Sequence, residues 1–225
     1  MSSSTGSDRD LRLEVASFAT PWGEGRLALL GDLPFELELP DGAAGSISVD
    51  ERPAPAARNG ADETSPTRAA RSWVALLERY FAGDPVGFGL DVDRFCAAHG
   101  FTGFETAVYR SLAAVPYGRA VSYRDLAVAA GRPLAWRAVG SAMALNPLPI
   151  VLPCHRVVRS DGTLGHYGTD PTWKARLLRH EGIEIMVDAG GLSPSARLVR
   201  RVAGERHAAS VPTTPGTPAS GVEAS

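Results

Sequence analysis

Cysteine is scarce in this sequence of 225 residues, which contains only Cys96 and Cys154. Two cysteines cannot build the dense disulfide framework of a small secreted domain, so we expect both thiols to be reduced. The five histidines are scattered, without a Cys-x-x-Cys or His-x-x-x-His spacing. A structural zinc site needs such closely spaced ligands. The sequence therefore predicts no metal site.

Long apolar runs are also missing. No stretch approaches the roughly 20 apolar residues that a membrane-spanning helix requires. Residues 1–10 are polar and lack the basic and apolar regions of a signal peptide. We therefore expect a soluble cytoplasmic protein that does not contact a membrane.

Excess charge of either sign is small, since the net charge is −2. That total argues against a nucleic-acid-binding protein, but the distribution of charge is uneven. Residues 1–99 hold 9 Lys and Arg against 16 Asp and Glu, whereas residues 100–184 hold 10 against 6. An anionic partner would therefore meet the second half of the chain. An excess of this size adds only a modest phosphate-binding contribution.

Three short strands are predicted near the N-terminus, at residues 11–18, 27–30 and 35–39, where apolar residues alternate with polar ones or cluster. Gly23 and Gly25 superficially resemble a dinucleotide-binding fingerprint. That motif requires a helix directly after the glycines, whereas residues 27–30 read as a strand. We therefore interpret these glycines as hairpin residues and predict no nucleotide site.

A helix follows, because apolar residues at helical spacing fill residues 73–81. Before it, residues 51–68 are rich in Pro, Ala, Arg and Gly without any period, which predicts a loop. After it, apolar residues alternate again over residues 88–92. Together these features predict a small α/β domain at residues 11–98, preceded by a disordered segment at residues 1–10.

The second half of the chain is predicted to be mainly helical. Apolar periodicity and turn residues indicate helices at about residues 103–115, 123–130 and 133–145. Ser122 is a good N-cap for the second helix, and Gly131 ends it. The last two helices have the shape of a helix-turn-helix. As a pattern alone this is weak evidence, because most paired helices bind no DNA.

The last of these helices has very small side chains, such as Ala138, Gly140 and Ser141, beside one cation, Arg137. Close packing between helices would explain small residues equally well. The functional alternative is a thin helix that enters a DNA groove with Arg137 projecting from it. The pattern alone does not choose between the two.

A proline-bracketed apolar run leads to Cys154, His155 and Arg156 and then becomes apolar again. For an arbitrary cysteine, the common explanation is a buried structural thiol. However, three polar groups inside an apolar run are costly unless they are paired. Flanking prolines also stiffen the loop, as a positioned nucleophile requires. We therefore favour a nucleophilic Cys154.

A thiol attacks as its thiolate, so another group must take its proton. His155 is the nearest candidate, but adjacent residues of an extended chain point to opposite faces, so a turn or a bridging water is needed. Glu181, at the end of an amphipathic helix, could fix the imidazole tautomer. Spacing alone does not establish that contact.

Several short motifs together resemble the methylated-DNA–protein-cysteine methyltransferases, which are O6-alkylguanine-DNA alkyltransferases. They are Ser122-Tyr123, Arg137-Ala138-Val139-Gly140, Asn146-Pro147, Pro153-Cys154-His155-Arg156-Val157-Val158 and His180-Glu181-Gly182. The likeness covers residues 103–184 nearly continuously and is loose before them. It implies an RNase H-like α/β domain, then a mainly helical, winged-helix-like domain with a helix-turn-helix at residues 99–186. Residues 187–225 are expected to form a largely disordered tail.

The resemblance implies DNA repair by transfer of the alkyl group from O6 of an extruded guanine onto Cys154, once and irreversibly. No cofactor is implied, and transfer from O4-methylthymine is a further expectation. The partner would be double-stranded DNA, bound by a monomer. Cys154 would be activated by His155 through a water, with Glu181 behind it. Tyr123 would donate to N3 of the guanine and offset the charge that develops there.

The same resemblance implies roles for DNA-binding and pocket residues. Arg137 would fill the gap that the extruded base leaves in the duplex. Asn146 would tie the recognition helix to the active-site loop. The other DNA-binding residues would be Ser122, Ala138 and Arg156. The alkyl pocket would be lined by Tyr167, Gly168 and Val157.

One stretch departs from the family pattern. After Gly165-His166-Tyr167-Gly168 the family usually continues with two glycines and an apolar residue, whereas this chain has Thr169-Asp170-Pro171. Asp170 can cap the next helix with Pro171 at its first position, so the loop need not be broken. The sequence does not predict the width of the pocket. Trp136 is also bulkier than the small residue usual before the arginine, and could help to wedge the duplex.

Three other functions fit parts of the sequence. A lesion sensor would flip the base without reacting, but such relatives lack the acceptor cysteine, which is present here as Cys154. A cysteine hydrolase would use Cys154 and His155 and leave Tyr123 and Arg137 unexplained. A helix-turn-helix regulator without chemistry ignores the whole stretch from residue 153 to 158. The alkyltransferase accounts for all of these features.

Overall fold

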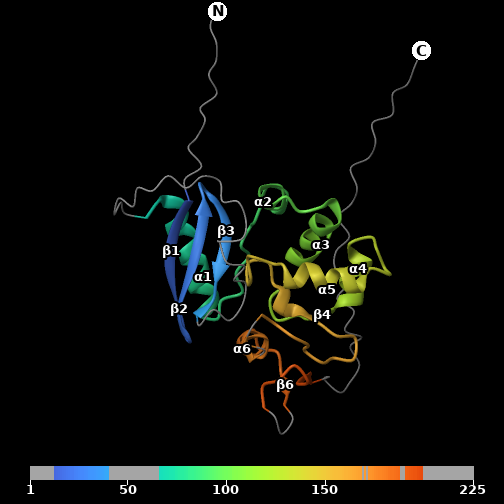
Figure 1. Cartoon of the computed structure of the whole chain (residues 1–225). Coiled ribbons are helices and arrows are strands. Elements are labelled where there is room, and N and C mark those ends of the chain that lie inside the picture. The colour runs from blue at the N-terminus through green and yellow to red at the C-terminus, as the bar shows by residue number, and fades with distance from the viewer. Residues whose placement is uncertain (1–12, 41–65, 169, 171, 188–190, 200–225) are drawn as a thin grey trace, which may run out of the picture.

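The computed structural model describes residues 13–40, 66–168, 170, 172–187 and 191–199, and has a mixed α/β fold. A three-stranded antiparallel sheet lies beside a group of short helices (Figure 1). The strands β1 (Leu13–Thr20), β2 (Gly23–Leu30) and β3 (Leu33–Glu38) pair in chain order. The helix α1 (Arg68–Phe81) packs against β1. The predicted strands and helix are thus confirmed.

The glycines of the first hairpin have a packing role. Gly23 pairs with Thr20 at the turn and has a φ of 129°, which glycine adopts without strain. A Cβ atom at Gly25 would collide with the ring of Phe18. Their interpretation as hairpin residues is therefore confirmed.

The segment after α1 differs from the prediction. The alternating residues 88–92 do not form a strand, and a helix that was not predicted, α2 (Val92–His99), begins there. The Asp91 side chain accepts a hydrogen bond from the Arg94 amide at 3.0 Å and caps this helix. Only Phe95 and Cys96 of α2 are buried, so its apolar period was too weak to detect.

Three helices form the upper part of the second half, α3 (Gly103–Ala113), α4 (Tyr123–Ala129) and α5 (Trp136–Ala144). Ser122 caps α4 through a reciprocal capping box with Asp125, as expected for its N-cap. The helix α5 begins at Trp136 rather than at Pro133. Residues 132–135 form a turn instead, closed by a hydrogen bond from the Ala135 amide to the Arg132 carbonyl.

A short parallel pairing brings the loop that carries Cys154 beside the start of α4. Strand β4 (Val121–Ser122) pairs with β5 (Val157–Val158), directly after the 3-10 turn η2 (Cys154–Arg156). The pairing lays the end of the turn that carries Cys154 beside the strand that leads into α4, and Tyr123 of α4 and Cys154 line the same cavity. The helix α6 (Thr172–His180) then packs against η2.

Paired structure continues beyond the predicted boundary at residue 186, since part of residues 191–199, which belong to the segment expected to be largely disordered, pairs with residues 185–186. Strand β6 (Ile185–Met186) pairs with β7 (Arg197–Leu198). The amides of Leu164 and Gly165 donate to the carbonyls of Ala196 and Pro194, at 2.9 and 3.0 Å. The predicted disorder at residues 1–10 and the remainder of the tail lie outside the described residues.

The predicted loop at 51–68 lies largely outside the described residues as well, and its last residues already belong to α1. Thr67 is the N-cap of that helix, and its side chain accepts a hydrogen bond from the Ala70 amide at 3.1 Å. Among the described helices, none is long and apolar enough to span a membrane. No group of three or more metal-ligating side chains occurs in the described part of the chain.

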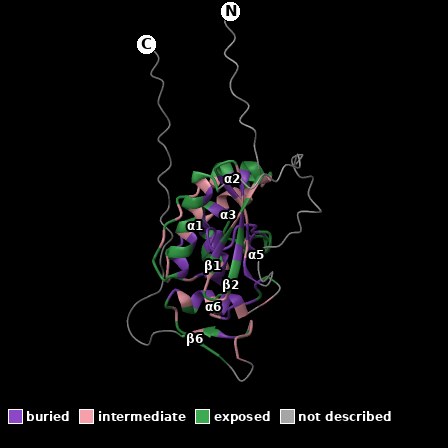
Figure 2. Cartoon of the chain, turned by 90° about the vertical axis from the view of Figure 1, so that its left-hand side faces the viewer, coloured by how far each residue is buried: buried purple, intermediate pink, exposed green. Residues whose placement is uncertain are grey.

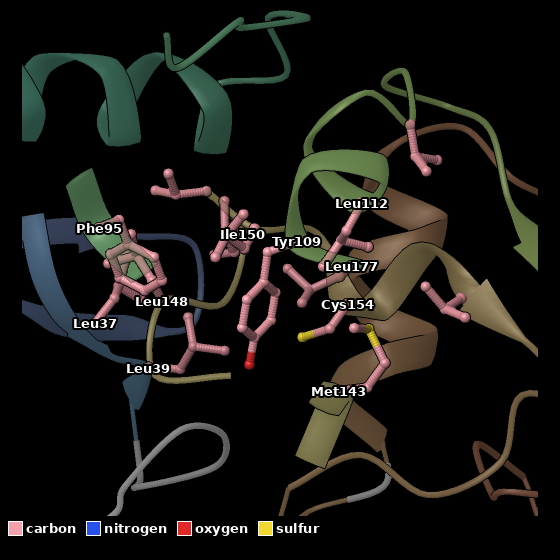
Figure 3. Close-up of a cluster of buried hydrophobic side chains, with 14 of the residues drawn as sticks. Leu37, Leu39, Phe95, Tyr109, Leu112, Met143, Leu148, Ile150, Cys154 and Leu177 are labelled. Carbon is pink, nitrogen blue, oxygen red and sulfur yellow. The ribbon is translucent and has the colours of Figure 1, made fainter. Parts of the chain in front are cut away.

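One hydrophobic core joins both halves of the chain. It runs from Phe18 of β1 through Tyr80 of α1 to Leu177 of α6, and it includes Cys154. Buried positions gather inside, while the outer faces of the helices carry exposed ones (Figure 2). Figure 3 shows Cys154 close to Met143 and Leu177 in this core. A backbone hydrogen bond of 2.8 Å from Leu37 of β3 to Pro147 also links the sheet to the active-site loop.

Candidate active site

The loop between α5 and β5 is held in place by the buried side chain of Asn146. Its Nδ2 donates to the Leu152 carbonyl at 2.8 Å and to the Cys154 sulfur at 3.1 Å. Its Oδ1 accepts from the Leu148 amide at 3.1 Å. The loop also contains Ile150 at a φ of 73°, a conformation that a β-branched residue adopts only when its surroundings enforce it. These contacts fix the position of the thiol.

Cys154 carries a free thiol that is almost completely buried, at 5% exposure. Burial raises the pKa of this thiol, while its hydrogen bonds with Asn146 and Tyr167 and the charge of Lys174 oppose that rise. The Tyr167 hydroxyl lies 3.8 Å from the sulfur. Cys96 is also free, so the prediction of two reduced thiols is confirmed.

His155 and Glu181 form a buried pair behind the thiol. The Nε2 atom of His155 lies 2.7 Å from Oε1 of Glu181, and both side chains have no exposed surface. Burial lowers the pKa of His155, although Glu181 opposes this shift. The Nδ1 atom of His155 is buried and has no hydrogen-bond partner among the described residues. The contact between His155 and Glu181 that was expected from the sequence is therefore present, through Nε2.

Glu181 is the most heavily hydrogen-bonded side chain of the site. Its Oε1 accepts from Tyr80 at 2.8 Å and from Nη2 of Arg156 at 2.9 Å, in addition to His155. Its Oε2 accepts from Nε of Arg156 at 2.9 Å and from the Gly118 amide at 3.1 Å. Burial raises the pKa of Glu181, but His155 and Arg156 outweigh it and hold the pKa far below its ordinary value.

Arg156 does not face a DNA-binding surface, so its predicted role as a DNA-binding residue is wrong. Its side chain is 6% exposed, and its guanidinium binds Glu181 and the Val115 carbonyl, the latter at 2.6 Å from Nη1. A guanidinium that is buried and bound to internal partners does not reach a phosphate at the surface. Asn146 is likewise buried, at 4% exposure, and ties the helix to the loop rather than presenting a surface to DNA.

A cavity of about 760 Å³ opens beside the thiol. Its lining includes residues predicted for catalysis, for DNA binding and for the alkyl pocket, namely Cys154, Tyr123, Arg137, Tyr167 and Gly168. Val157, which was also predicted to line the pocket, is fully buried and is not part of the lining. Ser122 and Ala138 lie outside the cavity as well, Ser122 as the cap of α4 and Ala138 on the exposed face of α5.

Lys174 is a buried cation of this cavity that sequence reasoning missed. It is 1% exposed, and its Nζ donates to the Val157 carbonyl at 2.5 Å. Burial lowers its pKa to about 8, although Cys154 opposes that shift. The ammonium also lies 5.7 Å from the ring centroid of Tyr123. Its position on an amphipathic helix gave no signal, because lysine on such a helix usually faces solvent.

Tyr80 is the second residue that sequence reasoning missed. In the sequence it only marks the apolar face of α1, yet its hydroxyl reaches Glu181 and lies 3.5 Å from Nε2 of His155. The contact joins residues 101 positions apart. No local pattern signals a pairing of that kind.

Three exposed arginines, Arg124, Arg137 and Arg159, line the cavity. The Arg137 guanidinium lies 4.6 Å from the ring centroid of Trp136, and both residues are exposed on α5. Arg124 and Arg159 also line the cavity, against one acidic residue, Asp161. The mouth is therefore positively charged, which suits an anionic ligand.

The stretch that departs from the family pattern contains a helix cap at Asp170. Asp170 accepts hydrogen bonds from the amide and the hydroxyl of Thr172 at 2.8 and 2.9 Å, at the start of α6. The predicted capping role of Asp170 is thus confirmed, while Pro171 lies outside the described residues.

Comparisons with known proteins agree with the geometry of this site. The family model for the DNA-binding domain of 6-O-methylguanine DNA methyltransferase matches residues 103–183. The mouse methylated-DNA–protein-cysteine methyltransferase is 56% identical over 77 residues, which are 34% of this chain and 36% of that protein. The rat relative is covered to a similar extent, 37%, so the alignments span little more than a third of these relatives.

Two further similarities extend over most of the chain. The human methylated-DNA–protein-cysteine methyltransferase is 34% identical over 179 residues, which are 78% of this chain and 83% of the human protein. The crystal structure of Mycobacterium tuberculosis OGT in complex with DNA shares 29% identity at a TM-score of 0.56, covering 75% of this chain and 92% of that one. The chain therefore belongs to the methylated-DNA–protein-cysteine methyltransferase family.

Proposed function

We propose that this protein repairs DNA by transferring the alkyl group from O6 of an alkylated guanine to the sulfur of Cys154. The observation that carries the proposal is a free thiol, held by Asn146, in one cavity with Tyr123 and Arg137. The names of the human and mouse relatives, and the DNA bound to the M. tuberculosis structure, support the same reaction and the same partner.

Double-stranded DNA is the partner, and the damaged base leaves the duplex to react. A sulfur that is 5% exposed cannot reach a base inside the stack, so the base must be extruded into the cavity. Arg137, exposed at the mouth of the cavity, fills the gap left in the duplex. Ser122 and Ala138 flank the same surface. The helices α4 and α5, which are arranged like a helix-turn-helix, present this surface to the DNA.

The proton of Cys154 passes through a bridging water to Nδ1 of His155, while the Nε2 proton of His155 is held by Glu181. The sulfur attacks the alkyl carbon, and the bond between that carbon and O6 breaks with its electron pair going to the guanine. Tyr123 donates to N3 of the guanine and offsets the developing charge. Its pKa is raised by burial, so it holds its proton until then.

The reaction occurs once for each molecule. The product is a thioether without a useful leaving group, so no step regenerates the thiol and no cofactor takes part. Tyr167 and Gly168 line the alkyl pocket, and O4-methylthymine presents the same kind of alkyl–oxygen bond. One chain reacts with one lesion, so a monomer, located in the cytoplasm, suffices.

The architecture supports the finer fold assignment that the resemblance implied. An antiparallel sheet in the order β1-β2-β3, followed by α1, fits the first part of an RNase H-like domain. The helix pair α4 and α5 beside the β4–β5 pairing fits a winged-helix-like domain.

Intact-protein mass spectrometry after mixing with a duplex that contains one O6-methylguanine tests the proposal. We expect the parent chain and the Cys96→Ala control to gain one methyl group each, and the Cys154→Ala variant to gain none. The gain should stop at one per molecule when lesion is in excess. Tight binding to the lesion without any mass gain would identify a sensor instead, and absence of lesion binding would contradict the proposal altogether.

A further inference from the structure

Tyr80 connects the N-terminal half of the chain to the reaction centre. It lies on α1, and the family model that matches residues 103–183 does not include it. The residue is completely buried, and its hydroxyl donates to Oε1 of Glu181 at 2.8 Å. The same oxygen lies 2.7 Å from Nε2 of His155. Tyr80 and His155 therefore share one acceptor atom, which also accepts from Arg156.

Sharing of this oxygen has an electrostatic consequence. Each donor that binds a carboxylate oxygen withdraws part of its negative charge, and leaves less to stabilise a neighbouring cation. Burial and the charge of Glu181 raise the pKa of Tyr80 well above its ordinary value, so its hydroxyl remains a donor at neutral pH. The imidazole of His155 thus faces a carboxylate whose charge is partly neutralised by Tyr80.

We propose that Tyr80 is a positioning residue for alkyl transfer, which keeps His155 neutral by occupying the Glu181 oxygen that would otherwise stabilise its protonated form. The inference rests on the proposed function, because it treats His155 as the base that accepts the thiol proton. A neutral His155 keeps the lone pair on Nδ1 that this step requires. The N-terminal half is therefore part of the reaction machinery and not only a support for the DNA-binding half.

Other groups act on the pair, and Arg156 also donates to the shared Oε1, from Nη2 at 2.9 Å. The titratable and charged side chains that act on His155 or Glu181 are those of Arg156, Lys174, Tyr80, Tyr117 and Tyr167. Arg156 and Lys174 are cations whose charges also lower the pKa of His155. Among the described tyrosines, only Tyr80 forms a hydrogen bond with the carboxylate itself.

The ring of Tyr80 is fixed independently of its hydroxyl, which allows a clean substitution. It packs edge-on against Phe81 at 5.2 Å between ring centroids and against Tyr117 at 5.9 Å. Phenylalanine at position 80 keeps these contacts. Glu181 also keeps its bonds to Arg156 and to the Gly118 amide. The Tyr80→Phe variant is thus expected to fold and to differ at the shared oxygen alone.

The test measures the second-order rate of alkyl transfer to the full chain between pH 5 and pH 9, for the parent and Tyr80→Phe. Tyr117→Phe is the matched control, because its hydroxyl bonds only to the carbonyls of Gly83 and His180. In Tyr80→Phe we expect the acidic limb of the profile to move to higher pH. The rate on that limb falls about tenfold for each unit by which the pKa of His155 rises. An unmoved limb, or an equal shift in Tyr117→Phe, overturns the inference.

A second readout does not depend on transfer and separates this inference from the proposed function. Titration of the His155 imidazole, followed by nitrogen-15 NMR in the parent and Tyr80→Phe, reports its protonation directly. The inference predicts that His155 takes up its proton at a higher pH in Tyr80→Phe than in the parent or in Tyr117→Phe. Equal titration in all three overturns it. An inactive parent with the expected NMR shift would contradict the proposed function and leave the coupling of Tyr80 to His155 supported.

Discussion

Asn146 donates a hydrogen bond of 3.1 Å from Nδ2 to the sulfur of Cys154. Because Asn146 follows α5 almost directly, this bond joins the helix that carries Arg137 to Cys154. A hydrogen bond to sulfur stabilises the thiolate more than the thiol, and so opposes the effect of burial on the Cys154 pKa. The same amide therefore sets both the position and the reactivity of the thiol.

The Asn146→Ala variant is expected to have a less reactive Cys154. Loss of the donor raises the pKa of the thiol, and loss of the two loop contacts lowers the free energy of unfolding by about 1–3 kcal/mol. Alkylation by iodoacetamide as a function of pH, in a Cys96→Ala background, reports Cys154 alone. A pH profile identical to that of the parent would show that Asn146 does not act on the sulfur.

Arg156→Met is expected to be strongly destabilising. Removal of one partner of a buried ion pair leaves an uncompensated charge and typically costs about 3–5 kcal/mol, which denaturant unfolding at pH 7 measures. Arg137→Ala is the contrasting variant, since its exposed guanidinium should contribute to DNA affinity and little to stability. If Arg156→Lys kept full stability and lost DNA affinity, the internal role assigned to Arg156 would be wrong.

Trp136→Ala is expected to weaken binding to duplex DNA. The indole is 42% exposed at the mouth of the cavity and stacks with Arg137, so it offers an aromatic surface to an unstacked base. Stacking of this kind contributes about 1–3 kcal/mol, hence about tenfold in affinity or more. Fluorescence anisotropy with labelled duplex and unreactive Cys154→Ala protein measures it. Leu134→Ala, at a position 92% exposed and outside the cavity lining, is the control and should bind as the parent does.

Acid should unfold the protein through the His155–Glu181 pair. The pKa of His155 is lowered in the folded state from 6.5, so the unfolded state takes up more protons as the pH falls below 6.5. The pKa of Glu181 is also lowered, from 4.5, so its contribution is full above pH 4.5 and is lost as the pH falls further. Both effects reduce stability in acid, by about 1.4 kcal/mol for each unit of pKa difference. Urea unfolding at pH 7.5, 5.5 and 4.5 measures the loss, and a constant free energy of unfolding would contradict it.

Sequence reasoning found the features that are encoded locally. The three strands, the capping of α4 by Ser122 and the hairpin glycines depend on neighbours a few residues away, and all were predicted. The helix α2 was missed because only Phe95 and Cys96 face the core. The start of α5 was placed three residues early because proline at position 133 is typical of a first helical turn.

The motifs and the resemblance predicted much of the candidate site, since Cys154, Tyr123, Arg137, Tyr167 and Gly168 all line the cavity. Cys154, His155 and Glu181 follow from a short motif and a resemblance, and the structure brings His155 and Glu181 together. Tyr80 and Lys174 act across long sequence separations, so no pattern around either residue marks it. The DNA-binding role predicted for Arg156 followed from the motif around Cys154. The position of its side chain is set instead by Val115 and Glu181, which lie far from it in the sequence.

The segment around β7 supports one wall of the cavity beside Cys154. Residues 162–165, which include the lining residue Gly165 and lie just before Tyr167, are hydrogen-bonded to the backbone of residues 194–198. A protein shortened after Met186 would lose this edge of the loop even though the matched family segment is intact. Affinity tags and fusion partners should therefore be attached beyond Val199, so that they leave the wall of the pocket undisturbed.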